Sequence, residues 1–194
     1  MSIDESCFSL PNSHENAEYF GCKPLEKWEM AFPYIKVVSF VETGTQIVTA
    51  SEIGPNKLNE QAMACSLIGY NYMNPGMLIL DDNKIFSVNF WTMASDTGAD
   101  LLWRARTDFP FPVDMELPDK SYLTRVQNKV DKDNCSSITV RVIEYQFHGN
   151  NIQNEGDAYR VVTSLCNHNK FSAKELITIY HEHQDIKTLF REIK

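Results

Sequence analysis

The order of apolar and polar residues along the chain predicts an α/β protein. Two runs rich in branched residues, 35–43 and 46–54, are joined by a short glycine-containing link and predict a β-hairpin. Segment 54–71 has a proline and an asparagine near its start and then places apolar residues at helical spacing, which predicts a helix. The continuous apolar run at 77–80 is typical of a strand buried on both faces.

The second half of the chain predicts two further kinds of structure. Segment 87–98 predicts a helix that ends at a glycine, and 99–106 predicts a strand, so a β-α-β unit is expected here. Three strand-like runs then predict an antiparallel block, at 121–128, 137–147 and 158–165. Ser172, with Glu175 three residues later, forms a capping-box pattern and predicts a helix that runs to the end of the chain. Residues 11–34 predict an extended excursion with one short helical turn.

Composition narrows the class of protein. The 194 residues are 43% hydrophobic and 11% aromatic, which suits one domain, or one domain with an insertion, and a sizeable core. No apolar run approaches the roughly 18 residues that a membrane span needs. The first residues have neither a basic segment nor an apolar segment of the secretory type, so we expect a cytoplasmic protein without a membrane part.

Cysteines and net charge limit the chemistry further. The five cysteines are widely spread without a C-x-x-C pair, which favours buried reduced thiols over a zinc site. The net charge of −8 argues against tight nucleic-acid binding by the whole surface, because phosphate affinity comes mainly from Lys and Arg. A net negative charge is still compatible with a local basic groove. An acidic site for divalent cations would also make the net charge more negative.

Two acids lie where strands are expected to end. Asp4 follows a very short first strand, and Asp82 follows the apolar run at 77–80. Carboxylates side by side at strand ends can hold two metal ions that clamp the attacking and leaving oxygens of a phosphoryl transfer. An aspartate after a strand is more often only a turn residue, so this pattern alone is weak.

Several stretches match one family, in order along the chain. "SIDESCFSLPNSHENAEYFG" resembles the strand with the first aspartate, and the loop after it, in DDE transposases of the insertion-sequence-four family, the Y-R-E-K signature group. "GMLILDDNKIFSVNFWTMASDTGADLLWRAR" resembles the segment around the second aspartate, and "ELITIYHEHQDIKTLFREIK" resembles the signature helix. The hairpin and the strand-like runs match as well, so the resemblance spans essentially the whole chain.

The resemblance implies a fold, an activity and partners. It implies an RNase H-like mixed sheet with flanking helices over 1–106, a β-rich insertion over 107–165, and a final core helix over 166–194. In this family two aspartates and one glutamate hold two Mg²⁺ or Mn²⁺ ions, and water and then a 3′-hydroxyl attack the phosphodiester at a transposon end. The expected partners are transposon-end DNA and either a second copy of the chain or an intact transposase.

The family's site maps onto this chain residue by residue. Asp4 falls on the first aspartate and Asp82 on the second, and both are expected metal ligands. A slip of one residue would exchange Asp82 for Asp81, and the two point to opposite faces of a strand, so only one can reach the metals. Tyr180 falls on the signature tyrosine and Lys194 on the signature lysine, both expected to contact DNA.

Two signature positions depart from the family. His183 stands where the family has a DNA-contacting arginine, and it is a weaker phosphate ligand than the bidentate arginine fork. Lys187 stands where the family has its catalytic glutamate. At about 4 Å and an effective dielectric near 20, one unit-charge contact is worth roughly 4 kcal/mol, so a lysine there weakens cation binding strongly. The chain is therefore expected to be impaired in cleavage.

Helical geometry offers no substitute for the missing glutamate. At about 100° per residue, the acids of the last helix lie far from the face of Lys187. This expectation assumes that a stripe of apolar side chains fixes the rotation of the helix, and the stripe comprises Ile179, Ile186, Phe190 and Ile193. DNA-binding and dimerisation segments that family members carry outside this core are also expected to be missing.

Two functions from different classes follow. The chain is either a Mg²⁺-dependent DNA transposase with impaired cleavage, or a non-catalytic remnant that binds DNA or an intact transposase. A repurposed interaction protein that uses the β block is a third possibility, which no residue favours.

Other residue pairs have simpler explanations than function. His181 and His183 lie two apart on a helix, about 160° from each other, so they cannot chelate one ion. Cys166 and His168 lie in a turn without an activating pattern, which favours a structural role.

Tryptophans and arginines remain as candidate nucleic-acid contacts. Trp28, Trp91 and Trp103 could stack on bases, but core packing is the favoured role, since Trp91 and Trp103 match core positions of the family. Arg104 and Arg106 alternate along the expected strand at 99–106, and they either touch DNA phosphate or lie on a solvated strand face.

Overall fold

The computed structural model describes residues 1–22, 32–82, 86–127, 137–146 and 158–182. The described part is a mixed α/β protein that divides into two compact units, Met1–Tyr72 (unit 1) and Met73–Gln184 (unit 2). None of the described helices is both long and apolar enough to cross a membrane. The two units are defined by how densely each packs within itself. The division at residues 106 and 165 comes from the family resemblance, and this division stays a prediction.

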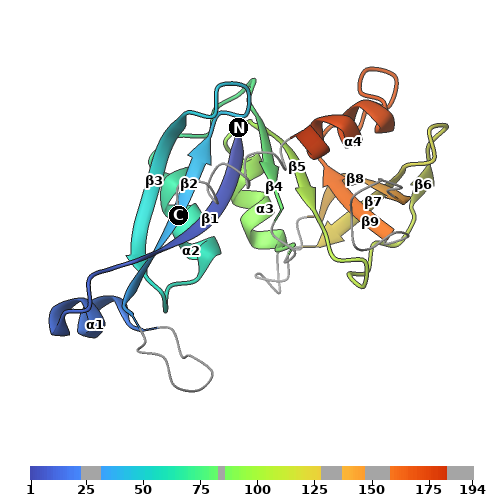
Figure 1. Ribbon diagram of the computed structural model, residues 1–194. Coiled ribbons are helices and arrows are strands. Elements are labelled where there is room, and N and C mark those ends of the chain that lie inside the picture. The colour runs from blue at the N-terminus through green and yellow to red at the C-terminus, as the bar shows by residue number, and fades with distance from the viewer. Residues whose placement is uncertain (23–31, 83–85, 128–136, 147–157, 183–194) are drawn as a thin grey trace. The chain divides into compact units, whose positions relative to one another are not determined.

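Unit 1 is a three-stranded antiparallel sheet with a helix on one face. Its strands are β1 (Ser2–Ser9), β2 (Tyr34–Val41) and β3 (Val48–Pro55), and they lie in the order β3-β2-β1 (Figure 1). Helix α2 (Glu60–Gly69) packs on the sheet through buried residues such as Met63 and Leu67. The hairpin and the helix predicted from the sequence are confirmed.

Two expectations in unit 1 need correction. Asp4 does not follow a short strand, because β1 has eight residues and Asp4 pairs with Ser39 inside it. The reason is that β2 pairs with β1 along its whole length, and a neighbouring strand overrides weak local propensity. The single helical turn expected in 11–34 is a seven-residue helix, α1 (His14–Phe20), with Ser13 as its N-cap.

Unit 2 contains a mixed six-stranded sheet. Strands β4 (Leu78–Asp81) and β5 (Asp100–Arg104) are parallel and connected by α3 (Val88–Ser95), as the sequence predicted. The antiparallel block follows, and the sheet order is β4-β5-β9-β8-β7-β6. The remaining strands are β6 (Met115–Glu116), β7 (Tyr122–Gln127), β8 (Ser137–Gln146) and β9 (Ala158–Thr163).

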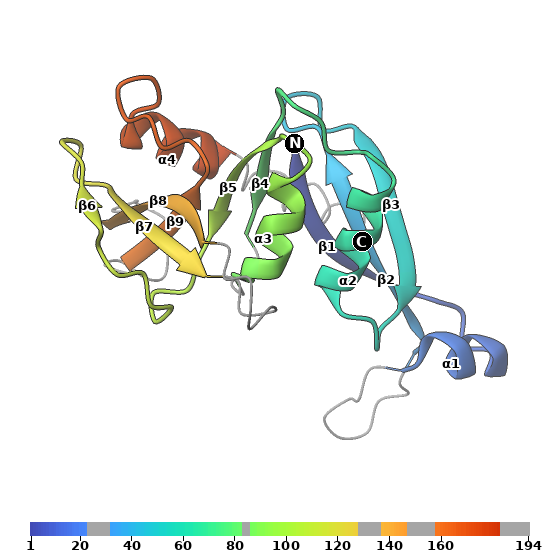
Figure 2. The same ribbon diagram turned by 180° about the vertical axis from the view of Figure 1, so that it is seen from behind.

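Two helices cover opposite faces of the unit 2 sheet. Helix α3 lies against β4 and β5 (Figure 2), where its buried Trp91 packs edge-on against Trp103 of β5. Both tryptophans are therefore core residues, as expected, whereas Trp28 lies outside the described residues. On the other face, α4 (Ala173–Glu182) packs on a core that includes Leu80 and Leu102.

The rotation of α4 differs from the expectation. Ile179 is 37% exposed, whereas Tyr180 is completely buried together with Leu176. The face that carries Tyr180 is thus the buried face of the described part of the helix. Apolar character alone suggested that Ile179 would be the buried residue. A tyrosine can also be buried stably when its hydroxyl has a hydrogen-bond acceptor. The other members of the expected stripe, Ile186, Phe190 and Ile193, lie outside the described residues.

The cysteines are also placed differently from the expectation. The four that the structure describes are thiols, but Cys22 is exposed and Cys7, Cys65 and Cys166 are only half-buried. Burial raises the pKa of the Cys166 thiol, which is the opposite of what a nucleophile needs and agrees with a structural role.

Candidate functional site

The strand register of unit 2 brings Asp82 beside Arg104. Parallel pairing of β4 and β5 sets Asp81 opposite Trp103, so the next residues of the two segments are neighbours. An Nη1–H of Arg104 donates to Oδ1 of Asp82 at 3.2 Å, and the two side chains are only 24% and 10% exposed, respectively. The strand end therefore carries a partly buried guanidinium–carboxylate pair.

Helix α4 adds a second donor to the same oxygen. The hydroxyl of Tyr180 donates to Oδ1 of Asp82 at 2.7 Å, although the two residues are 98 positions apart in the sequence. Burial, and then the negative charge of Asp82, raise the pKa of Tyr180 well above its usual range. Tyr180 therefore keeps its proton and remains a hydrogen-bond donor to the carboxylate at any physiological pH.

Aromatic rings surround the guanidinium of Arg104. The group lies over the ring of Tyr159 at 4.9 Å from its centroid, within the range of a cation–π contact. Tyr145 of β8 stacks on Tyr159 at 5.7 Å, and His181 meets the ring of Tyr145 edge-on at 5.5 Å. Burial, and then the charge of Arg104, lower the pKa of His181, so the imidazole is neutral at neutral pH.

These side chains form one polar and aromatic group, the Asp82 cluster. It consists of Asp82, Arg104, Tyr145, Tyr159, Tyr180 and His181. Its members come from the end of β4, from β5, β8 and β9, and from α4. The geometry also separates the two adjacent acids, because it is Asp82, and not Asp81, that accepts the hydrogen bond of Tyr180.

The Asp82 cluster does not by itself fit a two-metal centre. Mg²⁺ takes oxygen ligands, and Asp82 supplies them, but a guanidinium and a phenol both donate to its Oδ1. Within the described ranges, no three His, Cys, Asp or Glu side chains are grouped so that they could hold a metal ion. The guanidinium already supplies the positive charge that a cation would bring to this carboxylate.

The remaining residues of the predicted site lie elsewhere. Asp4 lies in β1 of unit 1, so its pairing with Asp82 of unit 2 stays a prediction. His183, Lys187 and Lys194 lie outside the described residues. Of the predicted site residues, the structure thus brings Asp82 and Tyr180 together.

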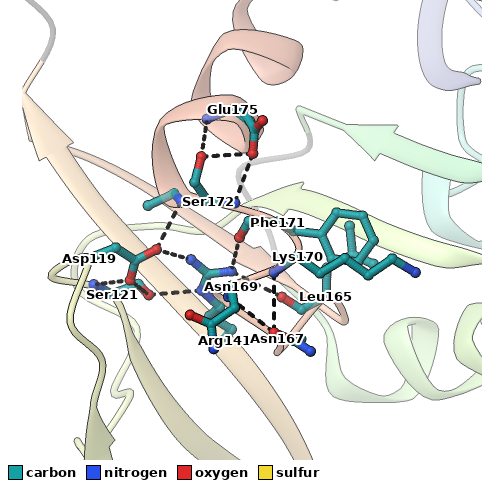
Figure 3. Close-up of polar contacts among 11 residues, drawn as sticks. Asp119, Ser121, Arg141, Leu165, Asn167, Asn169, Lys170, Phe171, Ser172 and Glu175 are labelled. Carbon is teal, nitrogen blue, oxygen red and sulfur yellow. Dashed lines mark hydrogen bonds and ion pairs between the residues drawn. The ribbon is translucent and has the colours of Figure 1, made fainter.

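A second arginine cluster fixes the start of α4 (Figure 3). Arg141 of β8 is fully buried and pairs through Nη2 with Asp119. Its Nε donates to Oγ of Ser121 at 2.8 Å, and its Nη1 donates to the carbonyl oxygens of Leu165 at 3.2 Å and Phe171 at 2.6 Å. The guanidinium therefore joins β8, the turn before β7 and the segment that leads into α4.

Asp119 connects this second cluster to the helix itself. Its Oδ2 accepts the backbone N–H of Ala173 at 2.9 Å, the first residue of α4. The predicted capping box is present, because Ser172 Oγ accepts the N–H of Glu175 at 3.3 Å and the Ser172 N–H donates back to Glu175 at 3.0 Å. These contacts set the position of the helix that carries Tyr180.

A cavity of about 470 Å³ borders the Asp82 cluster at Arg104. Arg106 and Arg160 also line it. Arg106 is largely exposed and pairs with Asp108, whereas Arg160 is mostly buried and pairs with Glu144 at 2.6 Å. The sequence left Arg104 and Arg106 open as either phosphate contacts or solvated residues. The structure distinguishes the two, because Arg104 is partly buried whereas Arg106 is largely exposed to solvent.

Sequence reasoning did not find most of the Asp82 cluster. Tyr145, Tyr159 and His181 were not singled out as neighbours of Asp82, and Arg141 was not singled out at all. A signal existed for Arg141, because a lone charge in the apolar run "ITVRVIEY" must be paired if that strand is buried.

Comparison with known proteins adds no assignment. No family model matches the chain, and a search of curated proteins finds no match. The resemblance to the insertion-sequence-four transposases therefore depends on the motifs quoted above.

Proposed function

We propose that this chain is a transposase core of the insertion-sequence-four type that binds DNA and is impaired in DNA cleavage. One observation carries the proposal. Asp82 and Tyr180 were assigned separately, to the second acid and to the signature tyrosine, and they share a 2.7 Å hydrogen bond across 98 residues. Two unrelated motif matches would have no reason to meet in this way.

The order of elements supports the same proposal. A hairpin, a helix, a β-α-β unit, an antiparallel block and a helix follow one another, as in an RNase H-like core with a β-rich insertion. In this proposal Asp4 and Asp82 are the two acids of the site, and the signature helix adds Tyr180. DNA is the proposed substrate, and a second copy of the chain or an intact transposase is a proposed partner.

Impaired cleavage follows from charge. Lys187 replaces an acid of the family's metal site, and Arg104 already pairs with Asp82. Each cation opposes binding of Mg²⁺ or Mn²⁺ through a like-charge interaction, and Arg104 does so from a partly buried position. The proposed metal affinity is therefore weaker than that of a family member with its glutamate.

A non-catalytic remnant that binds DNA or an intact transposase is the second candidate. The Arg104–Asp82 pair favours it, because Asp82 is neutralised by the protein's own cation. In that case the fold keeps the shape of the site without its chemistry.

Nicking of supercoiled plasmid in Mn²⁺ tests the proposal and separates the two candidates. We expect the natural chain not to nick and Lys187→Glu to nick, because that variant restores the third carboxylate. The matched control is Lys187→Glu combined with Asp82→Asn, which should be inactive.

Each result has a clear reading. Robust cleavage by the natural chain that disappears in Asp82→Asn would contradict the impairment. Absence of cleavage in Lys187→Glu would contradict the idea that the missing glutamate alone silences the site, and it would favour the remnant.

A further inference from the structure

We propose that the outer edge of β3 is a self-association surface, on which a second copy of this chain adds its own β3 as an antiparallel strand. This inference rests on the proposed function for the idea that a second copy is a partner, and it deepens that proposal by naming the surface. It uses no residue of the Asp82 cluster and lies entirely within unit 1.

The open edge of β3 is the first observation. β3 lies at the end of the strand order of unit 1, with β2 on one side and no strand of the described chain on the other (Figure 1). An edge strand presents a row of backbone N–H and C=O groups that can pair with a strand of another chain. The strand ends at Pro55, which has no N–H to donate, so the part suited to pairing is 48–54.

The side chains along this edge are apolar and exposed. Val48 is 45% exposed and Ile53 is 59% exposed, and Ile47, just before the strand, is 59% exposed. Val48 lies opposite Val41 of β2 and Ile53 lies opposite Val37. These two partners are four residues apart on one strand, so Val48 and Ile53 lie on the same face of the sheet. They form an apolar strip that a second strand would cover.

The edge lacks the features with which folded proteins prevent such pairing. Edge strands are commonly protected by lysines, prolines or very short length. Segment 37–56 contains no lysine or arginine, and β3 has eight residues. The register shift beside Val41 lies at one end of the strand and leaves 50–55 regular. The edge strand β6 of unit 2 is protected, because it has two residues and lies in the proline-containing segment 110–118.

Symmetry makes a second copy the partner that fits. Two identical antiparallel strands are related by a two-fold axis, so both copies contribute the same edge and the contact closes as a dimer. An axis at Ser51 sets Glu52 opposite Ala50 of the partner subunit, so the two carboxylates are not directly opposite. The added strand keeps the faces of the sheet, and Ile53 therefore lies beside Val48 of the partner subunit.

The charge of this edge argues against DNA as its occupant. Glu42 and Glu52 are the charged residues of segment 37–56, and phosphate binding depends mainly on Lys and Arg. Self-association through β3 is thus separate from DNA binding and can be measured without DNA.

Sedimentation velocity of the full chain without DNA tests the inference. Concentrations run from about 1 to 200 µM, because an interface of this size is small and weak. We expect a dimer that dissociates on dilution. Ile53→Lys places a charge on the edge and should raise the dissociation constant at least about tenfold. Met115→Lys is the matched control, because Met115 is 58% exposed on the edge strand β6, and it should leave the constant within about twofold.

A second variant separates loss of pairing from loss of folding. Val48→Lys changes the same face and should weaken the dimer as Ile53→Lys does. Both side chains are largely exposed, so both variants should keep the circular dichroism spectrum of the natural chain.

The outcomes separate this inference from the proposed function. A natural chain that stays monomeric at the highest concentration overturns the inference, and so does a dimer that survives both lysine variants of β3. Equal weakening by Met115→Lys also overturns it, since charge alone would then be responsible. Binding of a labelled DNA duplex by the natural chain is measured separately. Its absence overturns the proposed DNA binding and leaves the dimer result as it stands.

Discussion

Arg141 and Arg104 are both paired with one aspartate in the same unit, but their surroundings differ. Arg141 is fully buried and donates to Ser121, to Asp119 and to two backbone carbonyl oxygens. Arg104 is 24% exposed, contacts one oxygen of Asp82 and borders a cavity. The first guanidinium makes four hydrogen bonds with its five N–H groups, whereas the second makes one and keeps donors for another acceptor.

The difference teaches which arginine supports the fold and which can bind a ligand. Burying a guanidinium is costly unless its donors are paired, and acceptors from two segments pair most of the donors of Arg141. The Asp82 cluster leaves the hydroxyl of Tyr145 without a partner among the described residues. A complete network stabilises, and an incomplete one at a cavity is suited to recognition.

Replacing each of the two arginines should give the largest effect, a clear difference in the free energy of unfolding between the two variants. Arg141→Met leaves Asp119 without its buried partner and should lower the free energy of unfolding by about 3–5 kcal/mol. Arg104→Met should cost only about 1 kcal/mol, because Asp82 keeps the hydrogen bond of Tyr180. Urea unfolding followed by circular dichroism measures both.

A surface pair provides the control for this measurement. Arg125 pairs with Asp114 but is 66% exposed, so Arg125→Met should change the free energy of unfolding by no more than about 1 kcal/mol. Equal losses for Arg141→Met and Arg104→Met would contradict the division into a structural and a ligand-binding arginine.

The pH dependence of stability tests the structural role of the Arg141 cluster through Asp119. Burial opposes ionisation of Asp119, but hydrogen bonds from Ser121 and Ala173 and the charge of Arg141 lower its pKa overall. The folded state therefore binds this proton less readily than the unfolded state, and the contribution of Asp119 is present above about pH 4. It is lost as the pH falls through the lowered pKa.

Asp119→Asn tests this dependence. The variant should be less stable than the natural chain at pH 7, and the difference should shrink below about pH 4, where the natural carboxyl takes up its proton. Urea unfolding at a series of pH values gives the two curves. A difference that stays constant down to pH 3 would show that the charge of Asp119 is not what holds Arg141.

The sequence predicted elements better than it predicted contacts. The hairpin, the β-α-β unit, the antiparallel block and the capping box of Ser172 and Glu175 were all predicted from local patterns. Each of these depends on residues that are close in the chain. The length of β1 was not predictable, because the pairing with β2 and not the residues around Asp4 decides it.

Contacts between distant residues explain most of what was missed. The neighbours of Asp82 depend on the register of β4 with β5 and on the rotation of α4, which periodicity does not fix. The exposed Ile179 beside the buried Tyr180 shows why, since a hydrogen bond to a carboxylate outweighs the apolar character of an isoleucine. Family resemblance supplied Asp82 and Tyr180, but no pattern suggested Arg104 as their partner.

The salt dependence of DNA binding tests the central claim most directly, because it counts the phosphates that each arginine neutralises. Binding of a labelled duplex is measured over a range of salt concentrations for the natural chain, Arg104→Gln and Arg125→Gln. We predict that Arg104→Gln lowers the slope of log affinity against log salt by about 1 and weakens binding about tenfold. Arg125→Gln should match the natural chain. Equal slopes for the natural chain and Arg104→Gln would contradict the claim that the Asp82 cluster binds the DNA backbone.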